Sequence, residues 1–386
     1  MRKVPPKGYN KKEAKSELEK YEYSNIPDDK KVNVIAIMLE AYSDLSDAEG
    51  IEFKIDPYRK WHVLESQSYS GDLITNIFAG GTIDTERKFL TGATNLPTLR
   101  KKTNSYVYYF KEQGYTVEGS HPSSNFFYNR VNINKNLGFD NYYFLENKYE
   151  NLLNAYFIRD NILLDEITKL YKENKNTSKP YFSFNVTYQN HGPYPTEDVY
   201  HKQYIERKKG YTTEEYNILN SYFWGIEDTN NAIYDMIQEL KQDDEPVVCI
   251  LFGDHKPWLG NGGSVYTMLG MDMNSNTQEG AKNYYSTPYI IWANDRAKEV
   301  LNNEFIGTGE DISPNFLMNK FFELAGYDGN EYMKFTNEVF DKINVINTDF
   351  YYQNGEFTKE LTEENKKLLE KFNKVQYYQM NEFKNK

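Results

Sequence analysis

The chain has 386 residues, a formal net charge of −12 and a sequence pI of about 5.1, and 16% of its side chains are aromatic. This length suits one large domain or two modest ones. So acidic a chain argues against nonspecific nucleic-acid binding, which requires a basic face, and we expect no nucleic acid as a partner. The single cysteine, Cys249, cannot build a disulfide framework or a cysteine-rich zinc site, and we expect it to be a small buried hydrophobe.

The first 31 residues are polar and charged, without the apolar core of a signal peptide. We interpret residues 1–31 as a linker or a loosely docked helix over Lys11–Tyr21. No apolar run approaches the roughly 20 residues that cross a bilayer. If the protein is held at a membrane, we expect the tether to lie outside this chain.

The predicted elements alternate between strands and helices along most of the chain. Buried strands are predicted for VNVIAIML (32–39), YFSFNVTY (181–188), VVCILFGD (247–254) and TPYIIWAN (287–294), with ITNIFAGG (74–81) strand-like and YTVEG (115–119) a further strand. Helices are predicted at 83–90, ended by Gly92, at 105–114, 160–173 and 212–240, and at 313–326, where Ser313, Pro314 and Gly326 mark the two ends.

This alternation predicts an α/β fold with a mostly parallel central sheet flanked by helices. We assign residues 32–330 to that domain. The remaining residues, 331–386, are expected to form a small C-terminal α+β subdomain, with a hairpin that turns at Asn354-Gly355 and a charged helix over Glu363–Asn373.

Polar residues follow the predicted strands at the points where ligands of open α/β sheets bind. These residues are Glu40, Thr82, His191 and the adjacent pair Asp254 and His255. An acid and an imidazole are costly to bury unless they are paired or bound to a metal. Thr82, between two glycines and a helix, is either a helix N-cap or a hydroxyl placed at the positive helix end for an anion such as phosphate.

Six stretches of the chain together resemble the lipoteichoic acid synthase and phosphoglycerol transferase branch of the alkaline phosphatase/sulfatase superfamily. The stretches are IAIMLEAYSD, FAGGTIDTERKFLTG, GSHPSSNFFYNRVNINKNLGFDNYYF, YQNHGPY, LFGDHKP and STPYIIWAN. They cover residues 32–326 in the family's order, and the set is specific although no single piece is. The resemblance therefore implies the fold of that superfamily and an enzyme that transfers phosphoglycerol.

The resemblance implies a metal site made of Glu40, Thr82, Asp254 and His255, with Thr82 also the nucleophile. Three oxygen ligands and one imidazole suit a divalent ion. The family implies Mn²⁺, and Zn²⁺ and Mg²⁺ fit the same donors. A metal-bound hydroxyl is more acidic, so such an ion would activate Thr82 without a strong base.

The resemblance also implies a substrate pocket made of His121, Tyr128, Arg130 and His191. Arg130 would offer a planar fork to phosphate, and His191 would protonate the leaving group. Tyr128 stands where the family has tryptophan, and Ser123 stands where it has an acid. The resemblance therefore does not determine the shape of the glycerol pocket or the exact substrate. His62 and His201 match nothing in the family, and we expect them to be surface residues.

The expected function is therefore transfer of glycerophosphate from a glycerophospholipid to an acceptor hydroxyl, with a glycerophospholipid or polyglycerophosphate as substrate. We expect a monomer at the extracellular face of the bacterial membrane. A phosphodiesterase or phosphatase would share the first half-reaction. A sulfuric ester hydrolase would need a C/S-x-P-x-R motif, which the sequence lacks. An inactive surface binding domain is the alternative from another class, and the intact ligand set argues against it.

Overall fold

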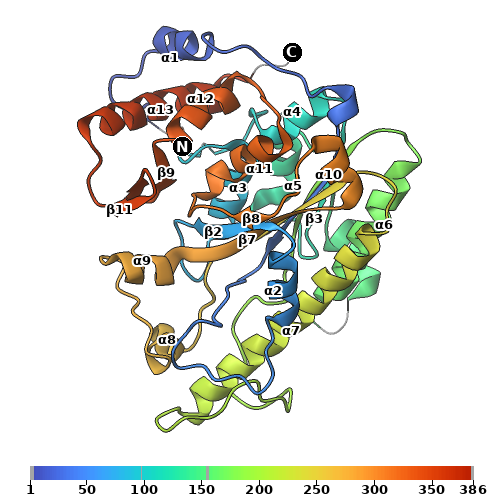
Figure 1. Cartoon of the computed structure of the whole chain (residues 1–386), viewed down its shortest axis with the longest axis vertical. Coiled ribbons are helices and arrows are strands. Elements are labelled where there is room, and N and C mark those ends of the chain that lie inside the picture. Colours follow the sequence, from blue (N-terminus) through green and yellow to red (C-terminus); the bar gives the residue numbers. More distant parts are fainter. Residues whose placement is uncertain (1–3, 97, 154–155, 384–386) are drawn as a thin grey trace.

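The fold is built around an eight-stranded sheet with the strand order β4-β3-β5-β1-β6-β7-β2-β8. It is seen in a computed structural model that describes residues 4–96, 98–153 and 156–383 (Figure 1). The five strands from β4 to β6 are parallel, whereas β7 runs antiparallel to both β6 and β2. The strands are β1 (Asn33–Leu39), β2 (Tyr69–Ile74), β3 (Thr116–Ser120), β4 (Asn141–Tyr143), β5 (Tyr181–Val186), β6 (Val247–Gly253), β7 (Ser286–Ala293) and β8 (Gly307–Thr308). The predicted α/β class with a mostly parallel sheet is confirmed.

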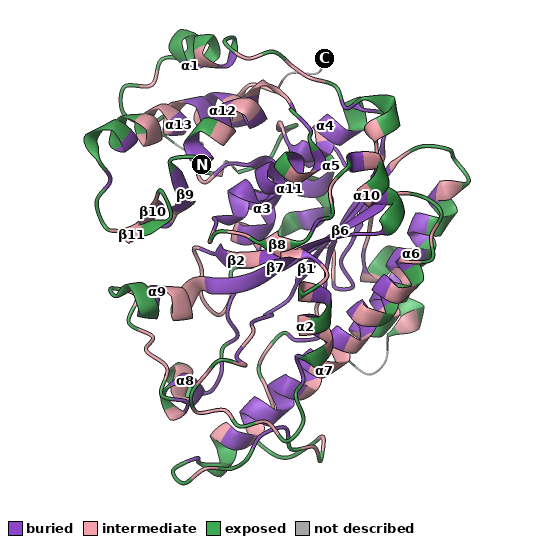
Figure 2. Ribbon diagram, viewed as in Figure 1, coloured by how far each residue is buried: buried purple, intermediate pink, exposed green. Residues whose placement is uncertain are grey.

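Helices cover both faces of the sheet, because successive side chains of a strand point to opposite faces. Along β1, Val34, Ala36 and Met38 pack into one core, and Ile35, Ile37 and Leu39 pack into the other. The first core contacts α3 (Ile83–Thr91), α4 (Tyr106–Glu112), α5 (Arg130–Leu137), α10 (Asp295–Leu301), α11 (Leu317–Ala325) and α12 (Glu331–Phe340). The second contacts α2 (Arg59–Glu65), α6 (Asp160–Lys175), α7 (Thr213–Leu240) and α8 (Ser264–Met268), and buried residues fill the interior between these layers (Figure 2).

The carboxyl ends of β1, β5 and β6 lie side by side at one edge of the sheet. The register pairs Leu39 with Gly253 and Met38 with Val186. The residues that follow these strands, Glu40, Thr187 and Asp254, must therefore meet at that edge. This is the geometric consequence that the sequence pattern predicted.

The strand predicted at 74–81 is wrong. The strand β2 ends at Ile74, and residues 75–81, all of them described, form no strand. Ala79, Gly80 and Gly81 have φ values of 56°, 141° and 84°, a conformation that an extended strand cannot accommodate. The apolar character that suggested a strand comes from side chains such as Phe78, whose ring stacks on Tyr284 at 4.1 Å. Thr82 thus reaches the sheet edge through a turn.

The C-terminal residues form a three-stranded antiparallel sheet and two helices beside the main body (Figure 1). The sheet contains β9 (Ile343–Ile346), β10 (Tyr351–Gln353) and β11 (Glu356–Thr358), and Asn354 and Gly355 turn the predicted hairpin with positive φ. The helix α13 (Glu363–Asn381) extends beyond the predicted Asn373, and its Phe372, Val375 and Tyr378 join the same core as α4.

The remaining predicted elements agree with the structure apart from their boundaries. The helix α1 (Lys11–Leu18) stops before the predicted Tyr21, and its Ala14 and Leu18 are buried. The helix α9 (Gln278–Tyr285), which precedes β7, was not predicted. Cys249 is fully buried among apolar neighbours, as expected.

Candidate active site

Glu40, Asp254 and His255 form a buried cluster in which three ligand atoms lie within 4.8 Å of one another. Glu40 follows β1 and the other two follow β6. The His255 Nε2 atom lies 3.2 Å from Asp254 Oδ2 and 3.6 Å from Glu40 Oε1. The exposed fractions are 4% for Glu40, 0% for Asp254 and 4% for His255. The structure therefore brings together three of the four metal ligands that the resemblance implied.

Backbone groups hold these side chains in place. Asp254 Oδ1 accepts hydrogen bonds from the amides of Ala41 and His255, both at 2.8 Å. The imidazole Nδ1 of His255 lies 2.9 Å from the carbonyl of Lys256. Because a carbonyl only accepts, Nδ1 donates this hydrogen bond, and Nε2 is the ring nitrogen that faces the cluster.

Gly253 is required by close packing and not by a turn. It ends β6 without a positive φ, but a Cβ at this position would lie 2.2 Å from the carbonyl oxygen of Tyr42. Only glycine lets the segment after β1 approach β6 this closely. The spacing between Glu40 and Asp254 depends on that approach.

The donor set fits a divalent cation. Asp254 Oδ2 and His255 Nε2 are buried and make no hydrogen bond within the described residues. Buried polar atoms are normally paired, so two orphaned atoms that face each other indicate a missing partner. Burial, followed by the nearby Asp254 carboxylate, raises the pKa of Glu40 well above its ordinary value. A cation between these groups would favour the ionised carboxylates and complete the coordination.

Thr82 lies beside this cluster, and its hydroxyl does not cap its helix. The residue occupies the N-cap position of α3, but its side chain makes no capping hydrogen bond. Its Oγ1 instead lies 3.5 Å from Glu40 Oε2, and only 6% of the residue is exposed. The neighbouring Thr85 ties the same helix to the cluster by donating to the Asp254 carbonyl at 2.7 Å. Of the two interpretations of Thr82, the geometry favours a hydroxyl placed for chemistry.

Arg130 is not the free phosphate fork that the sequence suggested. Its Nε and Nη2 atoms donate to the Glu86 carboxylate at 3.1 and 2.7 Å, and both residues are buried, with 2% and 1% exposed. Burial lowers the pKa of Arg130, but the Glu86 carboxylate more than offsets this, so the net pKa is raised. Glu86 lies one helical turn after Thr82, and the sequence analysis missed it. Its only signal was that i, i+4 spacing.

His121 is buried and neutral in this environment. Its Nδ1 donates to the Val186 carbonyl at 3.1 Å. Burial, and then the Arg130 charge, lowers the pKa of His121 well below its ordinary value. A neutral imidazole with its proton on Nδ1 can only accept at Nε2. In the expected substrate pocket, the His121 ring therefore suits a hydroxyl that donates a hydrogen bond to it.

His191 and Tyr128 are exposed, unlike the buried cluster. His191 stacks on Tyr188 at 5.2 Å, and its Nδ1 lies 2.6 Å from the Gly192 carbonyl. Tyr128 is 46% exposed, and its ring lies 5.3 Å from the Arg130 guanidinium. Ser123, at the position where the family has an acid, is buried.

The sequence analysis also missed the network that holds the loop carrying His191. Asn190 Nδ2 donates to the Thr229 hydroxyl at 2.9 Å, and that hydroxyl donates to Asp160 Oδ2 at 2.6 Å. A Cβ on Gly225 of α7 would lie 2.2 Å from Asn190 Oδ1. The position of this loop thus depends on its packing against α7. No pattern in the sequence of either segment indicated that contact.

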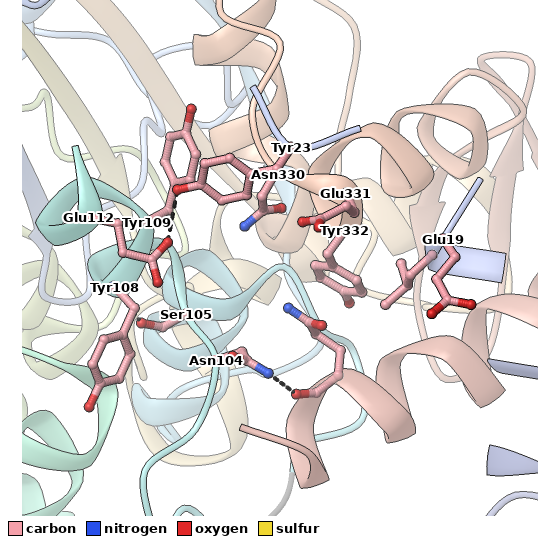
Figure 3. Close-up of a pocket in the computed structure, with 12 residues that line it drawn as sticks. Glu19, Tyr23, Asn104, Ser105, Tyr108, Tyr109, Glu112, Asn330, Glu331 and Tyr332 are labelled. Carbon is pink, nitrogen blue, oxygen red and sulfur yellow. Dashed lines mark hydrogen bonds between the residues drawn. The ribbon is translucent and has the colours of Figure 1, made fainter. Parts of the chain in front are cut away.

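Two cavities lie outside the cluster of Glu40, Asp254 and His255. One cavity, of about 80 Å³, lies between the N-terminal segment, α4, α12 and α13 (Figure 3). Polar groups that line it form hydrogen bonds with each other: Tyr23 donates to Glu112, and Asn104 donates to the Gln379 carbonyl. The other, of about 700 Å³, adjoins Lys256 and has an acidic lining. His62 lines it at the surface, with 37% of its side chain exposed, and its Nε2 lies 2.7 Å from Asp44 Oδ2. His201 is exposed, as expected.

Comparisons with known proteins agree on the fold. The family profile described as Sulfatase matches residues 32–327. The structure of the phosphoglycerol transferase GacH from Streptococcus pyogenes, in complex with sn-glycerol-1-phosphate, aligns with a TM-score of 0.74 and 21% identity, over 98% of this chain and 95% of that one.

Two curated relatives match most of the chain. A Rhizobium meliloti protein, whose name assigns it to the modification of cyclic beta-1,2-glucan, is 28% identical over 82% of this chain and 49% of its own length. Lipoteichoic acid synthase 1 of Bacillus subtilis is 24% identical over 84% of this chain and 50% of its own length. The chain thus spans about half the length of these relatives. Among the described residues, none of the helices has the length and apolar character to cross a membrane.

Proposed function

Because the chain belongs to the sulfatase family, whose profile matches residues 32–327, we propose that it is a metal-dependent phosphoglycerol transferase. Thr82 attacks the phosphate of a glycerophospholipid and passes glycerophosphate to an acceptor hydroxyl. The observation that carries the proposal is the position of the buried Thr82 hydroxyl. It lies 3.5 Å from Glu40 Oε2, in the same cluster as Asp254 Oδ2 and His255 Nε2, which have no hydrogen-bond partner among the described residues. The likeness to a phosphoglycerol transferase bound to sn-glycerol-1-phosphate supports this substrate class.

Glu40, Asp254 and His255 would hold the metal together with the Thr82 oxygen. We propose Mn²⁺, and Zn²⁺ and Mg²⁺ suit the same donors. When bound, the ion lowers the pKa of the Thr82 hydroxyl and stabilises the charge that develops on the phosphoryl oxygens. The residues of the chain carry the remaining steps.

In the first step the ionised Thr82 oxygen forms a bond to phosphorus, and the bond from phosphorus to the diacylglycerol oxygen breaks. The departing oxygen takes a proton from His191, so diacylglycerol leaves as an alcohol and the imidazole becomes neutral. The Nδ1 of His191 faces the Gly192 carbonyl, so the transferred proton comes from Nε2. Glycerophosphate is then bound covalently to Thr82.

In the second step the acceptor hydroxyl attacks the same phosphorus while its proton passes to the neutral Nε2 of His191. The bond between phosphorus and Thr82 breaks, which restores the ionised Thr82 and the protonated imidazole. Neutral His121, with only Nε2 free, accepts a hydrogen bond from a glycerol hydroxyl. The Arg130 charge, close enough to shift the pKa of both Glu40 and His121, favours the anionic substrate.

Thr82→Ala and Thr82→Ser test the proposal as a matched pair. The chain is incubated with phosphatidylglycerol and Mn²⁺, and diacylglycerol release and product mass are followed. We expect Thr82→Ala to lose at least a thousandfold in turnover, since it removes the nucleophile, while Thr82→Ser keeps measurable activity. The intact protein should also show a glycerophosphoryl adduct on a peptide containing Thr82. Substantial turnover by Thr82→Ala would refute the assignment.

The product mass separates the acceptors. Free glycerophosphate would indicate water as the acceptor and thus a phosphodiesterase of the same superfamily. A glycan that gains glycerophosphate would match the relative named for glucan modification. A polyglycerophosphate chain that grows would match the relative named lipoteichoic acid synthase. Because these names favour an acceptor outside the cytoplasm, we propose that the chain works at the extracellular face of the membrane.

A further inference from the structure

A group of apolar side chains is exposed on the segment that leads into α5. Phe126 is 83% exposed, Phe127 59%, Tyr128 46% and Val131 42%. Single exposed hydrophobic residues are common on soluble proteins, but four within six residues form a contiguous patch. We call residues 126–131 the aromatic tip.

The surrounding structure holds the aromatic tip in a defined shape. Tyr128 and Asn129 both have φ of 56°, which is costly for residues other than glycine and persists only where the surroundings impose it. The Glu146 carboxylate accepts hydrogen bonds from the Ser124 hydroxyl and the Asn125 amide, and Arg87 donates to the Tyr128 carbonyl at 3.1 Å. The exposed rings are therefore presented by a fixed loop.

The aromatic tip adjoins the candidate active site. Arg130, inside the tip, pairs with Glu86 one turn after Thr82 on α3. Arg87, which bonds to Tyr128, lies on the same helix. The exposed rings and the proposed nucleophile are thus connected through a single helical turn.

A basic surface made of residues from α5, from α4 and from the segment before α4 lies near the aromatic tip. Although the whole chain has a net charge of −12, the sequence has no acidic residue in 98–111 or 119–139. The exposed basic residues of these segments are Arg100, Lys101, Lys102, Lys111 and Lys135. Asp140 pairs with Lys111, so the basic residues without an ion pair among the described residues are Arg100, Lys101, Lys102 and Lys135. The exposed carboxylates nearby, Glu112 and Glu146, accept hydrogen bonds from Tyr23 and Ser124.

The two basic segments lie against each other. The Thr103 amide donates to the Asn136 carbonyl at 3.0 Å, and Asn136 Nδ2 donates to the Leu99 carbonyl at 2.8 Å. Lys102, Lys111 and Lys135 line a groove of about 730 Å³ together with Val131 of the tip and two acids, Glu112 and Asp140. Val131 of the tip and the lysines therefore share one groove, and the exposed rings directly precede the helix α5 that carries Val131 and Lys135.

We propose that the aromatic tip and this basic surface dock the enzyme onto a bilayer of anionic glycerophospholipid. Aromatic rings favour the membrane–water interface, and lysines beside them attract anionic headgroups. The proposal rests on the proposed function, because a lipid donor must place its headgroup near Thr82 while its acyl chains stay in the bilayer. Docking through the tip would bring the headgroup to the site with little extraction of the lipid.

Flotation with vesicles tests the docking surface without any turnover. The whole chain is mixed with vesicles of phosphatidylcholine alone or of phosphatidylcholine with phosphatidylglycerol. We expect binding to the anionic vesicles that weakens as salt is added. Phe126→Ser with Phe127→Ser should weaken binding by at least about tenfold, and Lys102→Glu with Lys135→Glu by about fivefold or more for each lysine. The matched controls Ile306→Ser and Lys209→Glu, both at exposed positions, should bind like the unaltered chain.

The outcomes separate the docking surface from the chemistry. Unaltered binding by both double variants, or no vesicle binding by the parent chain, would overturn the proposal. A change in oligomeric state when Phe126 and Phe127 are replaced would identify a protein contact instead and would also overturn it. Absence of diacylglycerol release by a parent chain that binds vesicles would count against the proposed function and leave the docking surface standing.

Discussion

Replacing Arg130 by methionine tests whether the buried ion pair with Glu86 holds α5 against α3. The change keeps a long apolar side chain but leaves the Glu86 carboxylate, which is 1% exposed, without its partner. Breaking one partner of a buried pair typically costs about 3–5 kcal/mol, because an uncompensated charge stays buried. We expect a loss of this size in the free energy of unfolding at pH 8.

Urea denaturation followed by tryptophan fluorescence measures this loss, with Glu86→Leu and the double variant as controls. Replacing both partners by apolar side chains is often close to neutral, so the double variant should be more stable than Arg130→Met alone. If Arg130→Met leaves the free energy of unfolding unchanged at pH 8, the pair is not structural. If, in that case, Arg130→Met raises KM without changing kcat, Arg130 is a contact to the substrate phosphate.

Three further predictions concern the metal and the supporting network. Asp254→Asn keeps the side-chain oxygen that accepts hydrogen bonds from the backbone but replaces the oxygen that has no partner. Added Mn²⁺ should therefore no longer raise the melting temperature of this variant. In the parent chain, Mn²⁺ at a hundredfold excess over Kd should raise the free energy of unfolding by about 2.7 kcal/mol. Gly225→Ala displaces Asn190 and should lower kcat by about tenfold to a hundredfold. The control Asp235→Ala, at an exposed position of the same helix, should leave kcat unchanged. Equal kcat values for the two variants would contradict a positioning role for Asn190. Burial raises the pKa of Asp160 to about 7, so the folded state holds this proton more tightly than the unfolded chain does, and stability falls as the pH rises towards 7. In urea titrations the parent should therefore lose about 2–3 kcal/mol relative to Asp160→Asn between pH 5 and pH 8, and parallel pH profiles would contradict this assignment.

The sequence by itself determined five strands of the sheet, β1, β3, β5, β6 and β7, and the residues that follow β1 and β6. Apolar runs such as VNVIAIML and VVCILFG are buried along their whole length, and parallel strands must end side by side. Glu40, Asp254 and His255 could therefore be placed together from the strand pattern alone. Thr82 was also identified, but for a partly wrong reason, since a turn and not a strand delivers it.

Only the tertiary structure decided which residues support and surround that edge. The contact between Glu86 and Arg130, and that between Gly225 and Asn190, join segments far apart in the sequence. Such contacts depend on how helices pack against the sheet, and hydrophobic periodicity tells which face of a helix is buried but not which side chain it meets. For the same reason the sequence could not show that Phe126 remains exposed, because a large apolar residue is ordinarily assigned to the core.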